Sequence, residues 1–234
     1  MKKLLQRWFA APPRLTAEQT ARLAAWRSLQ APVLTQPFGQ ARYVVVDVET
    51  TGLNLMTDTL ISIGAVAVVG GRIALADSFS VVLQQDRVSR KENILIHGIS
   101  GSVQREGIPP ANALLGFLDY LGKSPLVAFH VAFDETMIRR AMRQYLGLPF
   151  KHPWLDLAYL MPALHPALAR SHRVLDDWAN HFEIRNAARH DASADAMVTA
   201  QLLQVTLGQA RLKQAAHFAA LRDLEKAHRW AHRT

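Results

Sequence analysis

An apolar stretch that ends in two carboxylates constrains this chain more than any other feature. Residues 43–52 read YVVVDVETTG, and the period-two alternation of a β-strand puts Asp47 and Glu49 on one face. Both faces are apolar before Asp47, which is typical of a central strand covered on its two sides. Because ligands of open α/β sheets bind at the carboxyl ends of strands, a site is expected here.

The two neighbouring carboxylates favour a bound cation. Poorly solvated carboxylates that lie side by side repel each other and are costly to ionise. A divalent cation removes that cost, and hard carboxylate oxygens suit Mg²⁺ or Mn²⁺. An ordinary solvated strand end is the alternative that this stretch leaves open.

The remaining sequence places strands first and then alternates strands with helices. Residues 59–84 read as a β-hairpin joined at Gly70-Gly71, and 125–130 as a short buried strand. Helices are expected at 108–122, 134–147, 171–184 (capped by Ser171) and 192–208. This order predicts an α/β domain with a mixed sheet, in which the hairpin supplies the antiparallel strands.

Basic segments flank this domain. Residues 1–40 are expected to be an N-terminal extension and linker that begins as a basic arm, with Thr16 and Gln19 placed as the capping box of a helix. Residues 41–208 form the expected catalytic domain, and 209–234 a basic C-terminal helix. Each extension either holds a nucleic-acid strand or a partner, or packs on the domain as a structural addition.

Charge and cysteine content narrow the function classes. The net charge is +8, which favours polyanionic partners such as nucleic acid. The chain has no cysteine, which excludes disulfides, zinc–cysteine sites and thiol nucleophiles. No apolar run reaches the ~18–20 residues of a membrane span, and the first residues lack the apolar core of a signal peptide. We therefore expect no membrane partner and a cytoplasmic location.

Two further acids and a histidine fall near predicted helix starts. Asp134 begins the apolar stripe of its helix, although an N-cap role is an equally good explanation. His190 and Asp195 are five residues apart, about 140° in a helix, so His190 is expected before the helix and Asp195 inside it. Asp191 suits the first helical turn. A surface histidine is the alternative for His190.

Four carboxylates and a histidine on separate supports suit phosphodiester hydrolysis with two metal ions. Two ions about 3.5–4 Å apart hold the attacking and leaving oxygens. A histidine that titrates near neutral pH takes a proton from the attacking water.

Three segments, in order, resemble the motifs of DnaQ-like 3′–5′ exonucleases of the DEDDh branch. The first motif is YVVVDVETTGLN, followed by DTLISIGAVAV. The second motif is LVAFHVAFDETMI, and the segment before it is ENILIHGIS. The third motif is RHDASADAMVTAQLL. The resemblance runs from about residue 43 to about residue 207. It implies a ribonuclease H-like fold, with a mixed five-stranded sheet flanked by helices, and 3′–5′ release of nucleoside 5′-monophosphates from DNA ends.

The resemblance also implies residue roles. Asp47, Glu49, Asp134 and Asp195 would hold two divalent ions, Mg²⁺ or Mn²⁺, and His190 would be the general base. The backbone after the first motif would meet the terminal 3′-hydroxyl, and a leucine there would wedge against the terminal base. The residues expected to contact the substrate are Thr50, Thr51, Gly52, Leu53, His97, Ile99, His130 and Phe133.

Two departures from the family pattern stand out. Phe129 and His130 stand where the second motif usually has His-Asn, which affects the expected positioning of the strand and not metal binding. Ser62 stands where the proofreading epsilon subunit of DNA polymerase III often has a glutamate. The tail also contains no convincing clamp-binding peptide. Single-stranded DNA ends are the expected substrate and a DNA polymerase a candidate partner. RNA ends are one alternative, since no residue shows how a 2′-hydroxyl is read, and an inert binding module is another.

Overall fold

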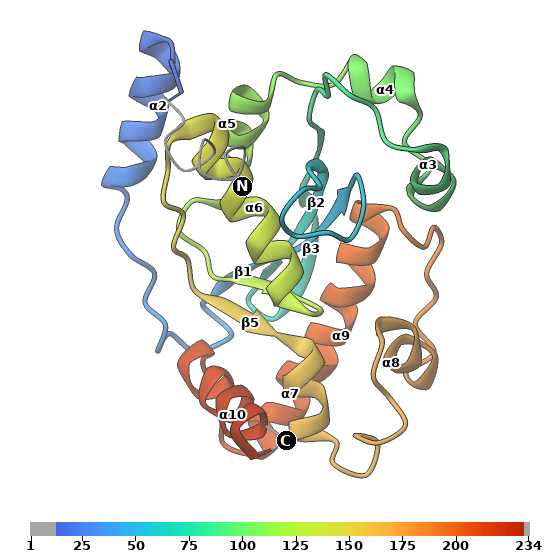
Figure 1. Ribbon diagram of the computed structural model, residues 1–234. Helices are drawn as coiled ribbons and strands as arrows, with labels where there is room; N and C mark the ends of the chain where they lie inside the picture. The colour runs from blue at the N-terminus through green and yellow to red at the C-terminus, as the bar shows by residue number, and fades with distance from the viewer. Residues whose placement is uncertain (1–12, 232–234) are drawn as a thin grey trace.

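One mixed sheet of five strands organises the structure, in the order β3-β2-β1-β4-β5 (Figure 1). The computed structural model describes residues 13–231, so most of the expected basic arm at the start lies outside the described residues. The strands are β1 (Arg42–Thr50), β2 (Leu60–Val69), β3 (Arg72–Val82), β4 (Leu126–Ala128) and β5 (Trp154–Asp156). The central strand β1 pairs antiparallel with β2 and parallel with β4, so the predicted mixed five-stranded sheet is confirmed.

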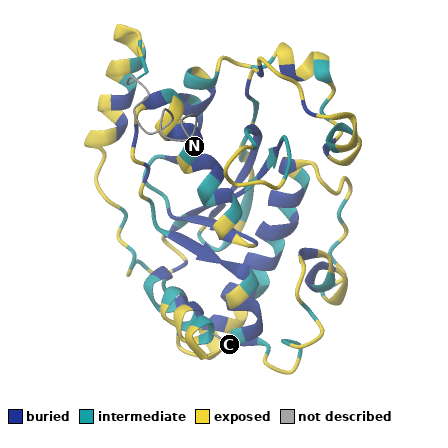
Figure 2. Ribbon diagram, viewed as in Figure 1, coloured by how far each residue is buried: buried dark blue, intermediate teal, exposed yellow. Residues whose placement is uncertain are grey.

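Helices cover both faces of this sheet (Figures 1 and 2). They are α2 (Ala17–Ser28), α3 (Lys91–His97), α4 (Gly101–Arg105), α5 (Pro110–Leu121), α6 (Val131–Leu146), α7 (Leu157–Leu164), α8 (Leu175–His181), α9 (Ala192–Leu212) and α10 (Phe218–Ala231). One core joins Val44, Val46 and Val48 of β1 to α2, α5 and α6. The other joins Tyr43 and Val45 to α7, α8, α9 and α10. The alternation predicted for β1 is therefore confirmed.

Local signals set several boundaries. Gly70 and Gly71 have φ angles of 61° and 80° between β2 and β3, as a two-residue hairpin turn requires. Thr16 and Gln19 form the predicted capping box of α2. The predicted cap at Ser171 is wrong, because α8 begins at Leu175. The carboxylate of Asp177 instead accepts the N–H groups of residues 173 and 174, at 2.8 and 3.0 Å, at that end of the helix.

The helices before and after the sheet contribute side chains to its cores. Trp26 of α2 packs against Phe150 and donates its indole N–H to the carbonyl of Gly122 at 2.6 Å. Residues 209–212 complete α9, and α10 follows as a separate helix that buries Phe218, Leu221 and Glu225. No helix within residues 13–231 is both long enough and apolar enough to span a membrane.

Candidate active site

Three of the predicted acids converge at the carboxyl end of β1. One oxygen each of Asp47, Glu49 and Asp195 lies within 4.8 Å of the other two. Asp47 and Glu49 are on the face of β1 that α9 covers, and Asp195 lies in the first turn of that helix with 1% of its surface exposed. We call these three side chains the carboxylate cluster. Its hard oxygen donors and its burial fit the divalent ions predicted for it.

Asp134 faces the same place from a different element. It lies in the first turn of α6, which follows β4, the parallel neighbour of β1. The helix begins at Val131, three residues earlier than predicted, so the alternative that Asp134 is an N-cap is wrong. The carboxylate is 4% exposed, and its charge raises the pKa of Asp47. Asp134 therefore acts on the carboxylate cluster without belonging to the compact set of three.

The acids are costly to ionise without a cation. Burial raises the pKa of Asp47 well above its ordinary range, and the charges of Asp134, Asp195 and Glu49 raise it further. Burial also raises the pKa of Glu49 to about 8, with a further contribution from Asp195. The pKa of Asp134 is raised for the same first reason. A bound cation would remove these costs.

Glu49 should make metal-free protein less stable as pH rises. Folding raises the pKa of the Glu49 carboxyl from 4.5 to about 8. The contribution of this group to the stability of the folded state is therefore complete below pH 4.5 and is lost as pH rises through 8. Thermal unfolding in EDTA from pH 5 to 8.5 should therefore show a smaller fall in midpoint for Glu49→Gln than for wild type. His97 and His152, whose pKa values are lowered by burial, contribute with the opposite sign, so this difference is the diagnostic quantity. Identical pH slopes for the two proteins would contradict the prediction.

Three groups of the protein donate hydrogen bonds to the carboxylate of Asp195. Its carboxylate accepts the side-chain amide N–H of Asn186, the guanidinium of Arg189 and, at 3.0 Å, the backbone N–H of His190. The positive charge of Arg189 lowers the pKa of Asp47 and Glu49. Neither Asn186 nor Arg189 was predicted from the sequence, because both act through a loop whose path depends on the tertiary structure.

His190 precedes α9 and Asp195 lies within it, as predicted. His190 has a left-handed backbone, with a φ of 66°, and an exposed side chain. Its backbone N–H, rather than its imidazole, contacts the carboxylate cluster. Asp191 is the N-cap and accepts the N–H of Ala194 at 2.9 Å, and its charge helps to raise the pKa of Glu49. The role of His190 as a base stays a prediction.

Gly64 allows α9 to approach the sheet closely enough for Asp195 to meet Asp47. It lies opposite Asp47 in the β1–β2 register. A Cβ atom at this position would lie 2.3 Å from the backbone of Ala192 and Ser193, at the start of α9. A glycine inside a strand is a sign of such close approach, and this signal in the sequence was missed.

Gly64→Ala should destabilise the fold and weaken the site together. The added methyl group meets backbone rather than a flexible side chain, so we expect a loss of about 1–3 kcal/mol and a displaced Asp195. Chemical denaturation and Mn²⁺ titration measure the two effects. Gly208→Ala is the matched control, because a Cβ at that position of α9 meets nothing within 4 Å and should stabilise the helix by about 0.5–1 kcal/mol. Equal behaviour of the two variants would contradict the prediction.

A buried acid that the sequence analysis missed holds the start of α6. Asp156, at the end of β5, accepts the backbone N–H groups of His130 at 3.0 Å and Val131 at 3.1 Å. The bonds from His130 and Val131 hold His130 in its left-handed conformation and set the first turn of α6, which carries Asp134. His130 itself is exposed.

The Asp156 carboxylate has two further partners. It accepts the backbone N–H of Ala158 at 3.0 Å, which caps α7, and the guanidinium of Arg229 in α10 at 2.8 Å.

The loop after β1 is tied at its base and exposed at its tip. The Thr51 hydroxyl donates to Asp58 at 3.1 Å, and Arg140 of α6 donates to the Met56 carbonyl at 3.0 Å. Leu53 is 86% exposed between these anchors. Of the predicted substrate residues of this segment, Thr50 ends β1, and Thr51, Gly52 and Leu53 follow it in this constrained loop.

Within residues 13–231, no hydrogen bond or ion pair joins the other predicted substrate residues to the carboxylate cluster. His97 is buried at the end of α3, where its Nδ1 accepts the N–H of Ile99 at 3.0 Å and its Nε2 has no hydrogen-bond partner. Phe133 is half-buried and packs on the core beneath α6. Asn93 donates to the carbonyl of Thr51, which brings α3 against the loop after β1.

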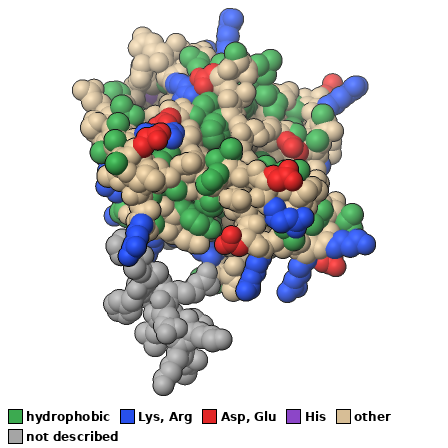
Figure 3. Space-filling model, turned by 90° about the horizontal axis from the view of Figure 1, so that it is seen from above, with side chains coloured by type: hydrophobic (Ala, Val, Ile, Leu, Met, Phe, Trp, Pro, Cys, Tyr) green, Lys and Arg blue, Asp and Glu red, His purple; other side chains and the backbone are tan. Residues whose placement is uncertain are grey.

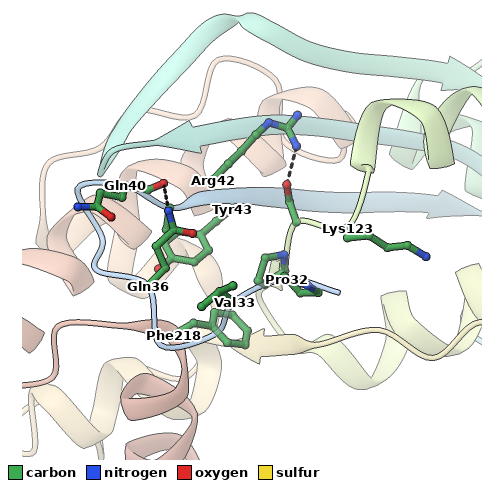
Figure 4. A pocket seen from close by; sticks show the side chains of 11 residues that line it. Pro32, Val33, Gln36, Gln40, Arg42, Tyr43, Lys123 and Phe218 are labelled. Atoms are coloured by element: carbon green, nitrogen blue, oxygen red, sulfur yellow. Dashed lines mark hydrogen bonds between the residues drawn. The ribbon is translucent and has the colours of Figure 1, made fainter. Parts of the chain in front are cut away.

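A cavity of about 270 Å³ lies at the other end of β1 (Figure 4). Arg42 and Tyr43, from the start of β1, line it together with the linker before the strand and Phe218 of α10. The Tyr43 hydroxyl is buried and has no hydrogen-bond partner. The cavity does not include any of the predicted catalytic residues, so it is distinct from the carboxylate cluster.

The sheet order and the helices on its two faces define a ribonuclease H-like fold. The predicted acids at the end of its central strand have supports on β1, α6 and α9. Residues 44–203 match the model of the RNase T exonuclease family. The chain belongs to this exonuclease family.

Curated relatives include DNA polymerase III of the PolC type. The protein from Thermotoga maritima is 32% identical over 165 residues, which are 70% of this chain and 12% of that protein. The protein from Bacillus subtilis is 32% identical over 172 residues, 73% of this chain and again 12% of the relative. The chain thus spans about one eighth of the length of these relatives.

Solved structures share the fold. E. coli exonuclease I in complex with a dT13 oligonucleotide aligns with a TM-score of 0.64 and 19% identity, over 75% of this chain and 43% of that one. Exonuclease X in complex with 5′ overhanging duplex DNA aligns with a TM-score of 0.60 and 18% identity, over 76% of this chain and 99% of that one. At these identities the likeness establishes the fold alone.

Proposed function

We propose that this chain is a metal-dependent 3′–5′ exonuclease of the DEDDh type that shortens single-stranded DNA. The observation that carries the proposal is the convergence of Asp47, Glu49 and Asp195, with Asp134 facing them, in a domain of the exonuclease family. Three buried or half-buried acids with raised pKa values suit divalent ions better than they suit a structural role.

The residues divide the chemistry between them. Asp47, Glu49, Asp134 and Asp195 would hold two Mg²⁺ or Mn²⁺ ions, which supply Lewis-acid stabilisation of the attacking and leaving oxygens. His190 accepts the proton of the attacking water. Its backbone N–H is anchored on Asp195 while its imidazole stays exposed, which leaves the ring free to meet a substrate bound over the cluster.

The surface suits a single strand. Leu53 is exposed in the anchored loop, four residues after Glu49, and we expect it to contact the terminal base. Figure 3 shows hydrophobic side chains gathered across the middle of one face and Lys and Arg side chains around its edge. Apolar side chains that contact bases, combined with cations that contact phosphates, are the usual means of binding single strands. The net charge of +8 adds long-range attraction.

The relatives support a DNA substrate and a polymerase partner. The PolC-type relatives are DNA polymerases, and the aligned exonuclease I and exonuclease X structures contain DNA. We therefore favour DNA over RNA, and we expect this chain to act beside a polymerase as a separate protein or domain.

A labelled-substrate assay tests the proposal. The protein is incubated with 5′-labelled single-stranded DNA, mismatched duplex or RNA, in Mg²⁺, Mn²⁺ or EDTA. Shortening of the DNA from its 3′ end that stops in EDTA supports the proposal, and faster trimming of RNA transfers it to an RNA substrate. Tight DNA binding without shortening in either metal would contradict it and favour an inert binding module.

A further inference from the structure

Arg189 bridges the carboxylate cluster and α8. One arm of its guanidinium contacts Asp195 Oδ2. Its Nε lies 3.0 Å from Oδ1 and 3.2 Å from Oδ2 of Asp176, in the first turn of α8. The Asp195 carboxylate is 2% exposed, whereas that of Asp176 is 51% exposed. The same cation therefore contacts one carboxylate inside the cluster and one at the surface.

The site holds more acidic side chains than basic ones. Asp47, Glu49 and Asp195, with Asp134 beside them, present four carboxylates to one guanidinium. Arg189 lowers the pKa of Asp47 and Glu49, so its field reaches the whole cluster. It compensates part of the repulsion that burial makes costly.

Arg189 and a metal ion compete for Asp195. The Oδ2 atom of Asp195 already accepts both Arg189 and the backbone N–H of His190, and Asn186 occupies Oδ1. A guanidinium on a carboxylate oxygen repels a divalent cation bound to that same oxygen. Arg189 must therefore leave Asp195 before this carboxylate can bind a metal ion fully, and it can do so without losing its contact with Asp176.

We infer that Arg189 is the internal counter-ion of the carboxylate cluster, and that its transfer, in which it releases Asp195 and is held by Asp176 alone, sets the affinity of the site for divalent ions. This inference rests on the proposed function. The bond from the His190 backbone to Asp195 does not involve Arg189, so the loop that carries the proposed base keeps its anchor during the transfer. Arg189 is thus a positioning residue and not a catalytic one.

Two substitutions should change metal affinity in opposite directions. Arg189→Gln removes the competing charge, so Mn²⁺ should bind at least about fivefold more tightly, while the unfolding midpoint in EDTA falls. Asp176→Asn removes the surface carboxylate that would hold Arg189 by itself after Asp195 is released, so Mn²⁺ should bind about fivefold more weakly. Calorimetric titration with Mn²⁺ alone measures both, without any nuclease assay. Arg185→Gln is the control, since Arg185 is an exposed arginine of the same loop and should change neither quantity.

The outcomes separate this inference from the proposed function. Tighter binding in Arg189→Gln together with weaker binding in Asp176→Asn supports the exchange. Unchanged or weaker binding in Arg189→Gln, with wild type that binds Mn²⁺ and cleaves DNA, overturns the inference alone and leaves Arg189 with a structural role. If Arg189→Gln does not fold, the Mn²⁺ affinity of Asp176→Asn is the test. A wild-type Mn²⁺ affinity in that variant overturns the inference. Wild type that binds no Mn²⁺ overturns the proposed function as well.

Discussion

Replacing Asp47 with asparagine is expected to lower the rate of DNA hydrolysis at least about 10³-fold, because metal-ion catalysis supplies several kcal/mol of charge stabilisation. The same variant should unfold at a higher temperature than wild type in EDTA. Asp47 is the acid that Asp134, Asp195 and Glu49 all repel, so a neutral side chain of the same shape removes a destabilising charge. Hydrolysis rates and thermal unfolding midpoints, each measured with Mg²⁺ and with EDTA, test the two expectations.

The control for Asp47→Asn is a carboxylate outside the site. Asp77 of β3 pairs with Arg42 at 2.8 Å, near the other end of β1. Asp77→Asn should reduce stability slightly and leave hydrolysis unchanged, the reverse of the pattern for Asp47→Asn. An Asp47→Asn variant with activity within tenfold of wild type would show that the carboxylate cluster does not hold the catalytic metal ions.

Loss of the imidazole at position 190 is the second large effect. His190→Ala should lower hydrolysis about 10²–10⁴-fold, the contribution expected of a general base. Mn²⁺ affinity should stay close to wild type, because the side chain is exposed and is not in the cluster.

The backbone of His190 requires a second variant. Its φ of 66° is a conformation that asparagine adopts more readily than alanine does. His190→Asn should therefore lose as much activity as His190→Ala while preserving the loop more faithfully. Recovery of near-wild-type activity in His190→Asn would place the effect in the backbone and would contradict the role of the imidazole as a base.

Much of the fold was predictable because its signals are local. The alternation along β1, the Gly70-Gly71 turn and the capping box at Thr16 each depend on residues a few positions apart. Where two local signals competed, the prediction failed: α8 has its N-cap at Val174, with Asp177 accepting the N–H groups there, and not at Ser171. The short strand β5 and its terminal Asp156 were not singled out, because three buried residues carry no period of their own.

The sequence by itself determined which residue types stand at the ends of which strands and helices, and therefore the class of fold and the set of acids. Only the tertiary structure decided how close those acids come and what balances their charge. Asp47 and Asp195 are about 150 residues apart in the chain, and they meet because Gly64 leaves room for α9. Arg189 compensates the cluster because its loop returns between α8 and α9. Such contacts depend on the distance between backbones, which a residue pattern along the chain does not contain.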